Sequence, residues 1–228
     1  GILSQQKSTK SEIEVSGGAQ KSEFDIYADE YEANKHFFLA HYFKDKYDNA
    51  LAKLPFINSE GVNITKIEVW VTNKTGTTND TRNIIAFLDL GETKSYYDES
   101  LGEGNVSNQD EVQIFSSIFP DNNSANNLFS KLTSLTGIRN INQVNSILQN
   151  TSFANGSDFE KLERARKLSE AEYTFNSQLG YISLNQALNN DEVLAVAFQY
   201  TIGSETYQVG ELSTTGPTSP DALILKLL

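Results

Sequence analysis

The chain has 228 residues, of which 38% are hydrophobic, and a formal net charge of -12. This acidic balance argues against nucleic acid and anionic lipid as partners, because both require clustered Lys and Arg side chains. Cysteine is absent, which excludes disulfides, thiolate nucleophiles and Cys-ligated metal sites. Methionine is absent even at position 1, so we expect a piece of a longer protein. No apolar run is long enough for a membrane-spanning helix, and insertion of this piece into a membrane is not expected.

Residues 1–23 are polar and include a Gly-Gly pair, which predicts a lead-in arm with a short edge strand at Ile13 and Val15. Residues 24–228 are predicted to form a single strand-rich domain. Near its start, the string KHFFLAHYF (residues 35–43) carries both histidines among aromatic residues. Its alternation places apolar side chains on both faces, which favours a central strand buried on two sides. Helical spacing of apolar residues in KDKYDNALAKLP then predicts a short helix.

Two strands are predicted next in the chain. NITKIEVWVTN alternates apolar and polar residues, with Trp70 out of phase, and TRNIIAFLDLGE is a more continuous apolar run. The connection KTGTTND is rich in turn residues, so we expect a hairpin or a pairing of near neighbours. Residues 93–109 show no sustained period and are predicted to form a surface loop.

A helical insertion is predicted around residues 120–168. Three stretches, SANNLFSKLTSLTG, NINQVNSILQN and SDFEKLERARKL, carry apolar residues at spacings of three and four. Ser124, Asn140 and Ser157 are candidate N-caps, and Gly137 is a candidate helix end.

The last third of the chain is predicted to return to strands. Turn residues near Gly180 and Gly203 divide two hairpins, and ALILKLL reads as a final strand. Strands on both sides of a helical block indicate the α+β class, with a mostly antiparallel β-sheet or sandwich and the helical insertion around residues 120–168.

His36 and His41 are the sharpest candidates for a metal or catalytic site. Being five residues apart, they lie on opposite faces of a strand or about 140° apart around a helix, so they cannot share a metal ion. With no other His and no Cys in the chain, only carboxylates remain to complete a ligand shell. A structural or hydrogen-bonded role is therefore expected for both rings.

Two acidic groups are candidates for calcium, and neither has the ligand spacing of an EF-hand. They comprise Asp25, Asp29, Glu30 and Glu32 in the first group, and Asp98, Glu99, Glu103 and Asn105 in the second. Solvated acidic loops are the expectation for both. Serine-nucleophile and phosphate-loop motifs are absent. The sequence therefore predicts no catalytic, cofactor-binding or metal-binding residues, and no cofactor.

Long strings of the chain are similar to one protein family. Five strings of this chain resemble consecutive stretches of the SprA family. In chain order they are ADEYEANKHFFLAHYFKDKYDNAL, ITKIEVWVTNKTG, TRNIIAFLDLGE, DFEKLERARKLSEAEYTFNSQLGYISLNQAL and DEVLAVAFQYTIGSETYQVGEL. Members of this family are very large outer-membrane translocons for gliding motility and type IX protein secretion in Bacteroidetes. The resemblance runs from near Ile13 to the end of the chain.

The resemblance implies a non-enzymatic structural and interaction domain, placed between strands of the translocon barrel. The implied partners are the rest of that barrel, secreted cargo and accessory proteins, and the implied location is the cell-surface side of the outer membrane. An apolar or aromatic surface should then be left bare on the isolated domain.

Two other hypotheses stay open from the residues. The first is a carbohydrate-binding β-sandwich of the cell surface, with Trp70, Tyr96 and Tyr97 as stacking rings. The second is a glycosidase-like enzyme, which needs a cleft with two carboxylates about 5 to 10 Å apart.

Overall fold

The computed structural model describes most of the chain. The described residues are 14–16, 19–21, 32–52, 55, 57, 61–93, 112–115 and 120–228. The chain divides into two units, residues 1–33 and 34–228. In the first unit, β1 (Glu14–Ser16) and β2 (Ala19–Lys21) pair as an antiparallel hairpin. The predicted boundary between a lead-in arm and the domain at residue 23 stays a prediction.

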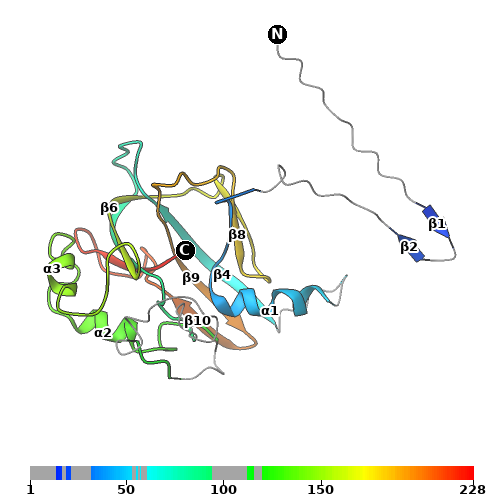
Figure 1. Ribbon diagram of the computed structural model, residues 1–228, viewed down its shortest axis with the longest axis horizontal. Helices are drawn as coiled ribbons and strands as arrows, with labels where there is room; N and C mark the ends of the chain where they lie inside the picture. The colour runs from blue at the N-terminus through cyan, green and yellow to red at the C-terminus, as the bar shows by residue number, and fades with distance from the viewer. Residues whose placement is uncertain are drawn as a thin grey trace, which may run out of the picture. The chain divides into compact units, whose positions relative to one another are not determined.

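The second unit is built around a small mixed barrel of five strands (Figure 1). The strands follow one another around the barrel as β4 (Val62–Val71), β9 (Leu194–Ile202), β11 (Leu223–Leu227), β5 (Thr81–Phe87) and β6 (Phe159–Lys167), and β6 pairs again with β4. The pair β11–β5 is parallel, and the other pairs of this ring are antiparallel. A further strand, β10 (Glu205–Val209), forms a hairpin with the second half of β9. The predicted strand-rich, mostly antiparallel fold is confirmed.

Two outer layers cover the barrel, one on each side (Figure 1). One layer is an antiparallel sheet with the strand order β3 (His36–Phe38), β8 (Tyr181–Leu184) and β7 (Tyr173–Asn176). It is accompanied by the helix α1 (His41–Leu51), which follows β3 in the chain. The opposite layer is the helical insertion, with α2 (Leu128–Ser134) and α3 (Val144–Leu148).

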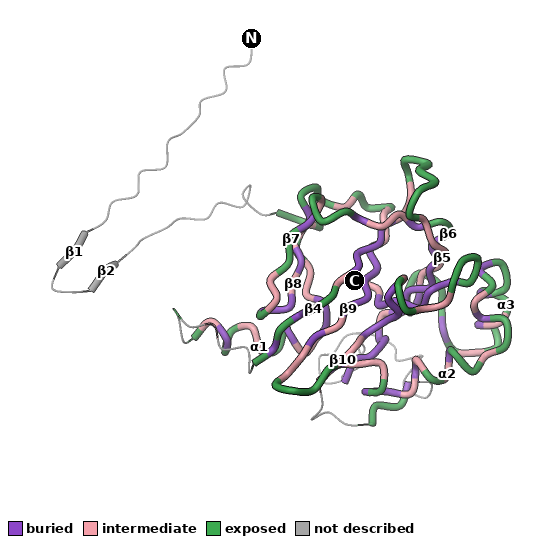
Figure 2. Tube along the Cα trace, turned by 180° about the vertical axis from the view of Figure 1, so that it is seen from behind, coloured by how far each residue is buried: buried purple, intermediate pink, exposed green. Residues whose placement is uncertain are grey.

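Alternate residues of the barrel strands fill separate cores. Ala195 and Ala197 of β9 face the barrel interior, where they pack with Trp70 and other side chains. Their neighbour Phe198 faces the three-stranded sheet and α1, whereas Ile224 of β11 faces the helical insertion. Burial on both faces explains the nearly continuous apolar runs of these strands. Figure 2 shows the buried stretches gathered in the barrel strands.

The stretch SDFEKLERARKL, predicted as the third helix of the insertion, forms the strand β6 instead. The helical prediction rests on the spacing of three between Phe159, Leu162 and Ala165, which are all buried. In the strand, Phe159 faces the insertion and Leu162 faces the barrel interior. An extra residue opposite β5, where Arg164 has a φ of 51°, then returns Ala165 to the interior. A bulge on a strand buried on both faces thus gives its apolar residues the spacing expected of a helix. The predicted helical range 120–168 is therefore too long, because it includes β6.

The other two helices of the insertion are present but short. α2 begins at Leu128 rather than after Ser124, and α3 begins at Val144 rather than after Asn140. The Asn-rich residues before each helix form turns, because Asn side chains accept hydrogen bonds from the backbone two residues further on.

The segment KHFFLAHYF, predicted as one two-sided strand, is a short strand followed by a helix. β3 ends at Phe38, and α1 begins at His41. The helix begins there because two distant carboxylates accept its first N–H groups. The His41 N–H lies 3.2 and 3.3 Å from the two Glu92 oxygens, and the Tyr42 N–H lies 2.9 Å from Asp121. Local sequence carries no sign of such acceptors.

The predicted pairing of β4 with β5 is wrong, because β6 lies between them. The connection between the two strands crosses the end of β6 instead of closing a hairpin. The hairpins predicted at Gly180 and Gly203 are confirmed as β7–β8 and β9–β10, and ALILKLL contains the predicted final strand β11.

Candidate interaction surface

An open hollow lined mainly by aromatic rings lies between α1 and the three-stranded sheet. We call it the aromatic face; its residues are His36, Phe37, Phe38, Tyr47, Tyr181 and Ser183, and its volume is about 390 Å³. The Phe38 ring packs edge-on against Tyr47 and Tyr181, with 5.2 and 6.3 Å between ring centroids. The three rings are only partly buried, so they present apolar surface to solvent.

The helix that supplies Tyr47 is fastened to the barrel through a buried polar cluster at its first turn. The cluster consists of His41, Glu92, Asp121 and Lys226. Glu92 and Asp121 are 1% and 0% exposed. Lys226 of β11 lies 2.8 Å from Glu92, and Asp121 accepts the N–H and the hydroxyl of Thr93 at 2.8 and 2.7 Å. Hydrogen bonds and the contact with Lys226 thus satisfy the buried polar groups.

Burial sets the protonation of this cluster. Burial, helped by the neighbouring Asp121 and opposed by Lys226, raises the pKa of Glu92 to about 8. The carboxyl groups of Glu92 and Asp121 lie close together, because they accept the N–H groups of consecutive residues, His41 and Tyr42. Burial and the nearby Lys226 lower the pKa of His41, whose Nδ1 lies 3.8 Å from Glu92. At neutral pH the imidazole is therefore uncharged and Glu92 holds a proton.

His36, the other histidine, lies on β3 in the aromatic face and is not a member of this cluster. Its Nδ1 lies 2.8 Å from the Ser183 hydroxyl, across the pair of strands β3 and β8. A His–Ser contact is one part of a nucleophilic site, but these residues are direct cross-strand neighbours on an exposed surface. The register of the strands is sufficient to explain this contact.

A second hollow of about 700 Å³ lies between β4 and the chain around β7. Glu68, which is 5% exposed, pairs there with Lys167 at 2.9 Å and accepts two hydrogen bonds from Ser213. Against the effect of burial, the hydrogen bonds from Ser213 and Lys167 lower the pKa of Glu68. The Glu68 carboxylate is therefore already paired within the domain, so this hollow offers fewer groups to a partner than the aromatic face does. One ring in its lining, Phe175, is 43% exposed.

Trp70, the tryptophan proposed to stack on a sugar, is buried inside the barrel and is 1% exposed. It cannot offer a stacking platform, and Tyr96 and Tyr97 lie outside the described residues. Glu92 and Asp121, a pair of buried carboxyl groups, both accept N–H groups at the start of α1 and leave no room for a glycosidic bond.

The acidic groups considered for calcium lie mostly beyond the described ranges. Of their eight residues the structure describes Glu32, which is exposed. Within the described part of the chain, no three His, Cys, Asp or Glu side chains are grouped as metal ligands.

The polar cluster was not predicted from the sequence, although one of its members, Lys226, could have indicated it. Lys226 lies in an otherwise apolar strand, and a buried lysine requires a buried acceptor. Glu92 and Asp121 lie in connecting segments, where acidic residues are ordinary. Their burial depends on contacts between distant parts of the chain.

A comparison with protein families identifies the chain. The SprA_N family, described as a motility related/secretion protein, matches residues 2–193. The chain therefore belongs to the SprA family, which is associated with an outer-membrane secretion system and with motility rather than with catalysis. A comparison with curated proteins finds no match. Among the described residues, no helix has the length and the apolar character that a membrane crossing requires.

Proposed function

We propose that this chain is a non-enzymatic structural and interaction domain of a very large outer-membrane translocon for type IX protein secretion and gliding motility. Membership of the SprA family supports the cellular system. The aromatic face is the observation that carries the interaction role, because it gathers several partly exposed aromatic rings in one hollow of the domain.

The chemistry of the aromatic face suits a protein partner. Partly exposed Phe and Tyr rings supply large contact areas with little loss of side-chain entropy, and such residues dominate binding energy at interfaces. His36 and Ser183 add polar groups at the same surface. Strands and a fastened helix hold these side chains in place, so little ordering is needed when a partner binds.

The rest of the parent translocon is the first proposed partner, and secreted cargo and accessory proteins are further ones. A net charge of -12 disfavours nucleic acid and anionic lipid headgroups. The domain is proposed to lie on the cell-surface side of the outer membrane without entering the membrane itself.

A double substitution in the parent protein tests the role of the aromatic face. Phe38→Ala with Tyr181→Ala should weaken partner binding at least about tenfold, as expected for two interface aromatics, and should reduce secretion and gliding in cells. Phe175→Ala removes an exposed ring outside the aromatic face and is the matched control. Normal secretion by a double variant that accumulates to normal levels would refute the proposal.

A further inference from the structure

The first turn of α1 depends on carboxyl groups that are far away in the chain. The residue before the helix, Ala40, provides no side-chain cap, and the first turn contains no acidic residue. Instead, Glu92 accepts the N–H of His41 and Asp121 accepts the N–H of Tyr42. These two carboxyl groups, here called the carboxyl pair, satisfy N–H groups that every helix leaves open at its start.

The geometry of the carboxyl pair requires a proton. Glu92 and Asp121 accept the N–H groups of consecutive residues and are buried, so their carboxyl groups lie too close together for both to be ionised at low cost. The other charged or titratable groups that face them are His41, Tyr42 and Lys44 of α1, Asp89, Tyr200 of β9 and Lys226 of β11. Lys226 balances one negative charge through its contact with Glu92. Loss of a proton from Glu92 therefore leaves a second negative charge in a buried site.

We propose that the proton that Glu92 holds beside Asp121 controls the attachment of α1 to the barrel, so that α1 detaches more often when this proton is lost. Because Tyr47 of α1 lines the aromatic face, detachment also changes the shape of that surface. The inference concerns the helix itself and holds whatever partner the aromatic face binds.

The sign of the effect follows from the two states of Glu92. With α1 attached, the pKa of Glu92 is about 8; with α1 detached and the carboxyl in water, it returns to about 4.5. The attached state therefore holds more protons between these values, and detachment becomes easier as pH rises from about 4.5 to about 8. Linkage limits the change to about tenfold per pH unit. Above pH 8 both states are ionised and the effect levels off.

His41 acts in the opposite direction at lower pH. Its pKa lies below the ordinary 6.5 when α1 is attached, so its protonation favours detachment as pH falls below 6.5. Above about pH 7.5 this histidine is mostly neutral in both states. Between about pH 6.5 and 7.5 its opposing effect is smaller than that of Glu92, so the opening constant still rises with pH.

Hydrogen exchange of the α1 amides in the full chain, corrected for the intrinsic pH dependence of exchange, measures detachment. In the unmodified protein the opening constant of α1 should rise with pH between 6.5 and 8, by up to about tenfold per unit. Glu92→Gln, which is neutral and of the same shape as the protonated acid, should show no such rise. Glu160→Gln is the matched control, because burial also raises the pKa of Glu160, which lies on β6. It should keep the slope of the unmodified protein.

Two results would overturn the inference. One is an α1 opening constant in the unmodified protein that is flat between pH 6.5 and 8, which decides the matter even if Glu92→Gln fails to fold. The other is an unchanged slope in a folded Glu92→Gln variant. The infrared band of a protonated carboxyl group at pH 7 provides a separate readout; it should be present in the unmodified protein and absent from the variant.

Discussion

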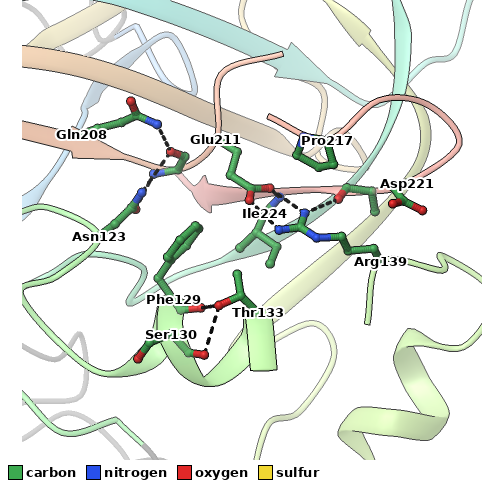
Figure 3. Close-up of polar contacts among 12 residues, drawn as sticks. Asn123, Phe129, Ser130, Thr133, Arg139, Gln208, Glu211, Pro217, Asp221 and Ile224 are labelled. Carbon is green, nitrogen blue, oxygen red and sulfur yellow. Dashed lines mark hydrogen bonds and ion pairs between the residues drawn. The ribbon is translucent and has the colours of Figure 1, made fainter. Parts of the chain in front are cut away.

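Arg139 and Glu211 form a bidentate ion pair that joins the helical insertion to the barrel (Figure 3). Nη1 and Nη2 of the guanidinium lie 2.9 and 2.6 Å from the two carboxylate oxygens. Arg139 also donates to the carbonyl of Ala222 at 3.0 Å, and Glu211 accepts the N–H of Ile224 at 2.9 Å. One ion pair thus connects the insertion to the last strand of the barrel through both side chains and backbone.

Replacing Arg139 by Met should destabilise the fold. The substitution leaves the largely buried Glu211 without its cation, which costs about 2 to 3 kcal/mol. Urea unfolding followed by circular dichroism measures the loss. Lys74→Met is the control, since it breaks an exposed ion pair with Asp191 that contributes little to stability. Equal losses in the two variants would show that the Arg139 pair has no special role.

Gly180 allows the close approach of α1 to the β7–β8 hairpin. A Cβ atom at this position would lie 2.1 Å from Cγ of Phe43 in α1. Gly180→Ala should therefore cost about 3 kcal/mol or more, from steric overlap and from a φ of +66°. Gly76→Ala has nearly the same φ, +67°, with open space around it, and should cost only about 1 kcal/mol. Thermal unfolding of both variants separates overlap from backbone strain, and similar melting temperatures would contradict the structure.

The C-terminal segment should be required for folding although the family match ends before it. The match stops at residue 193, directly before β9, and residues 194–228 contain two of the five barrel strands. A chain ending at residue 193 should therefore lack a closed barrel and be rapidly degraded by protease. Removal of residues 1–33, which form a separate unit, should leave the rest folded. Protease resistance of the chain that ends at residue 193 would argue against the barrel.

Tryptophan fluorescence should report directly on the barrel interior. Trp70 is the only tryptophan of the chain and is 1% exposed. Its emission should be shifted to short wavelength and resist quenching by iodide until urea unfolds the protein. Oligosaccharides should leave the emission unchanged, because the ring is not available for stacking. Strong quenching in the folded state, or a shift on adding sugars, would revive the carbohydrate hypothesis.

The local pattern of apolar and turn residues predicted most strands, but it failed where contacts between distant parts of the chain decide the conformation. Turn residues at Gly180 and Gly203 mark hairpins that depend on neighbours in the chain, and both are present. β6 was missed because its bulge at Arg164 produces a spacing of three between buried residues. The start of α1 was missed because its capping groups lie 51 and 79 residues away.

The candidate surface was only partly accessible to prediction. The segment KHFFLAHYF attracts attention for its histidines, and the structure places His36, Phe37 and Phe38 from it in the aromatic face. The face also needs Tyr181, which reaches it through the pairing of β3 with β8, and Tyr47, which reaches it through α1. A surface that brings the neighbouring elements β3 and α1 together with the distant β8 follows from the fold and has no motif of its own.

Photo-crosslinking in the parent protein tests the central claim most directly. Tyr181 is replaced by benzoylphenylalanine in cells, and Thr77, which is exposed in the connection between β4 and β5, is replaced in the same way as the control. The account predicts specific crosslinks from position 181 to another part of the translocon or to a secretion component, and none of these from position 77. Absence of crosslinks from position 181 in a protein that secretes normally would contradict the account.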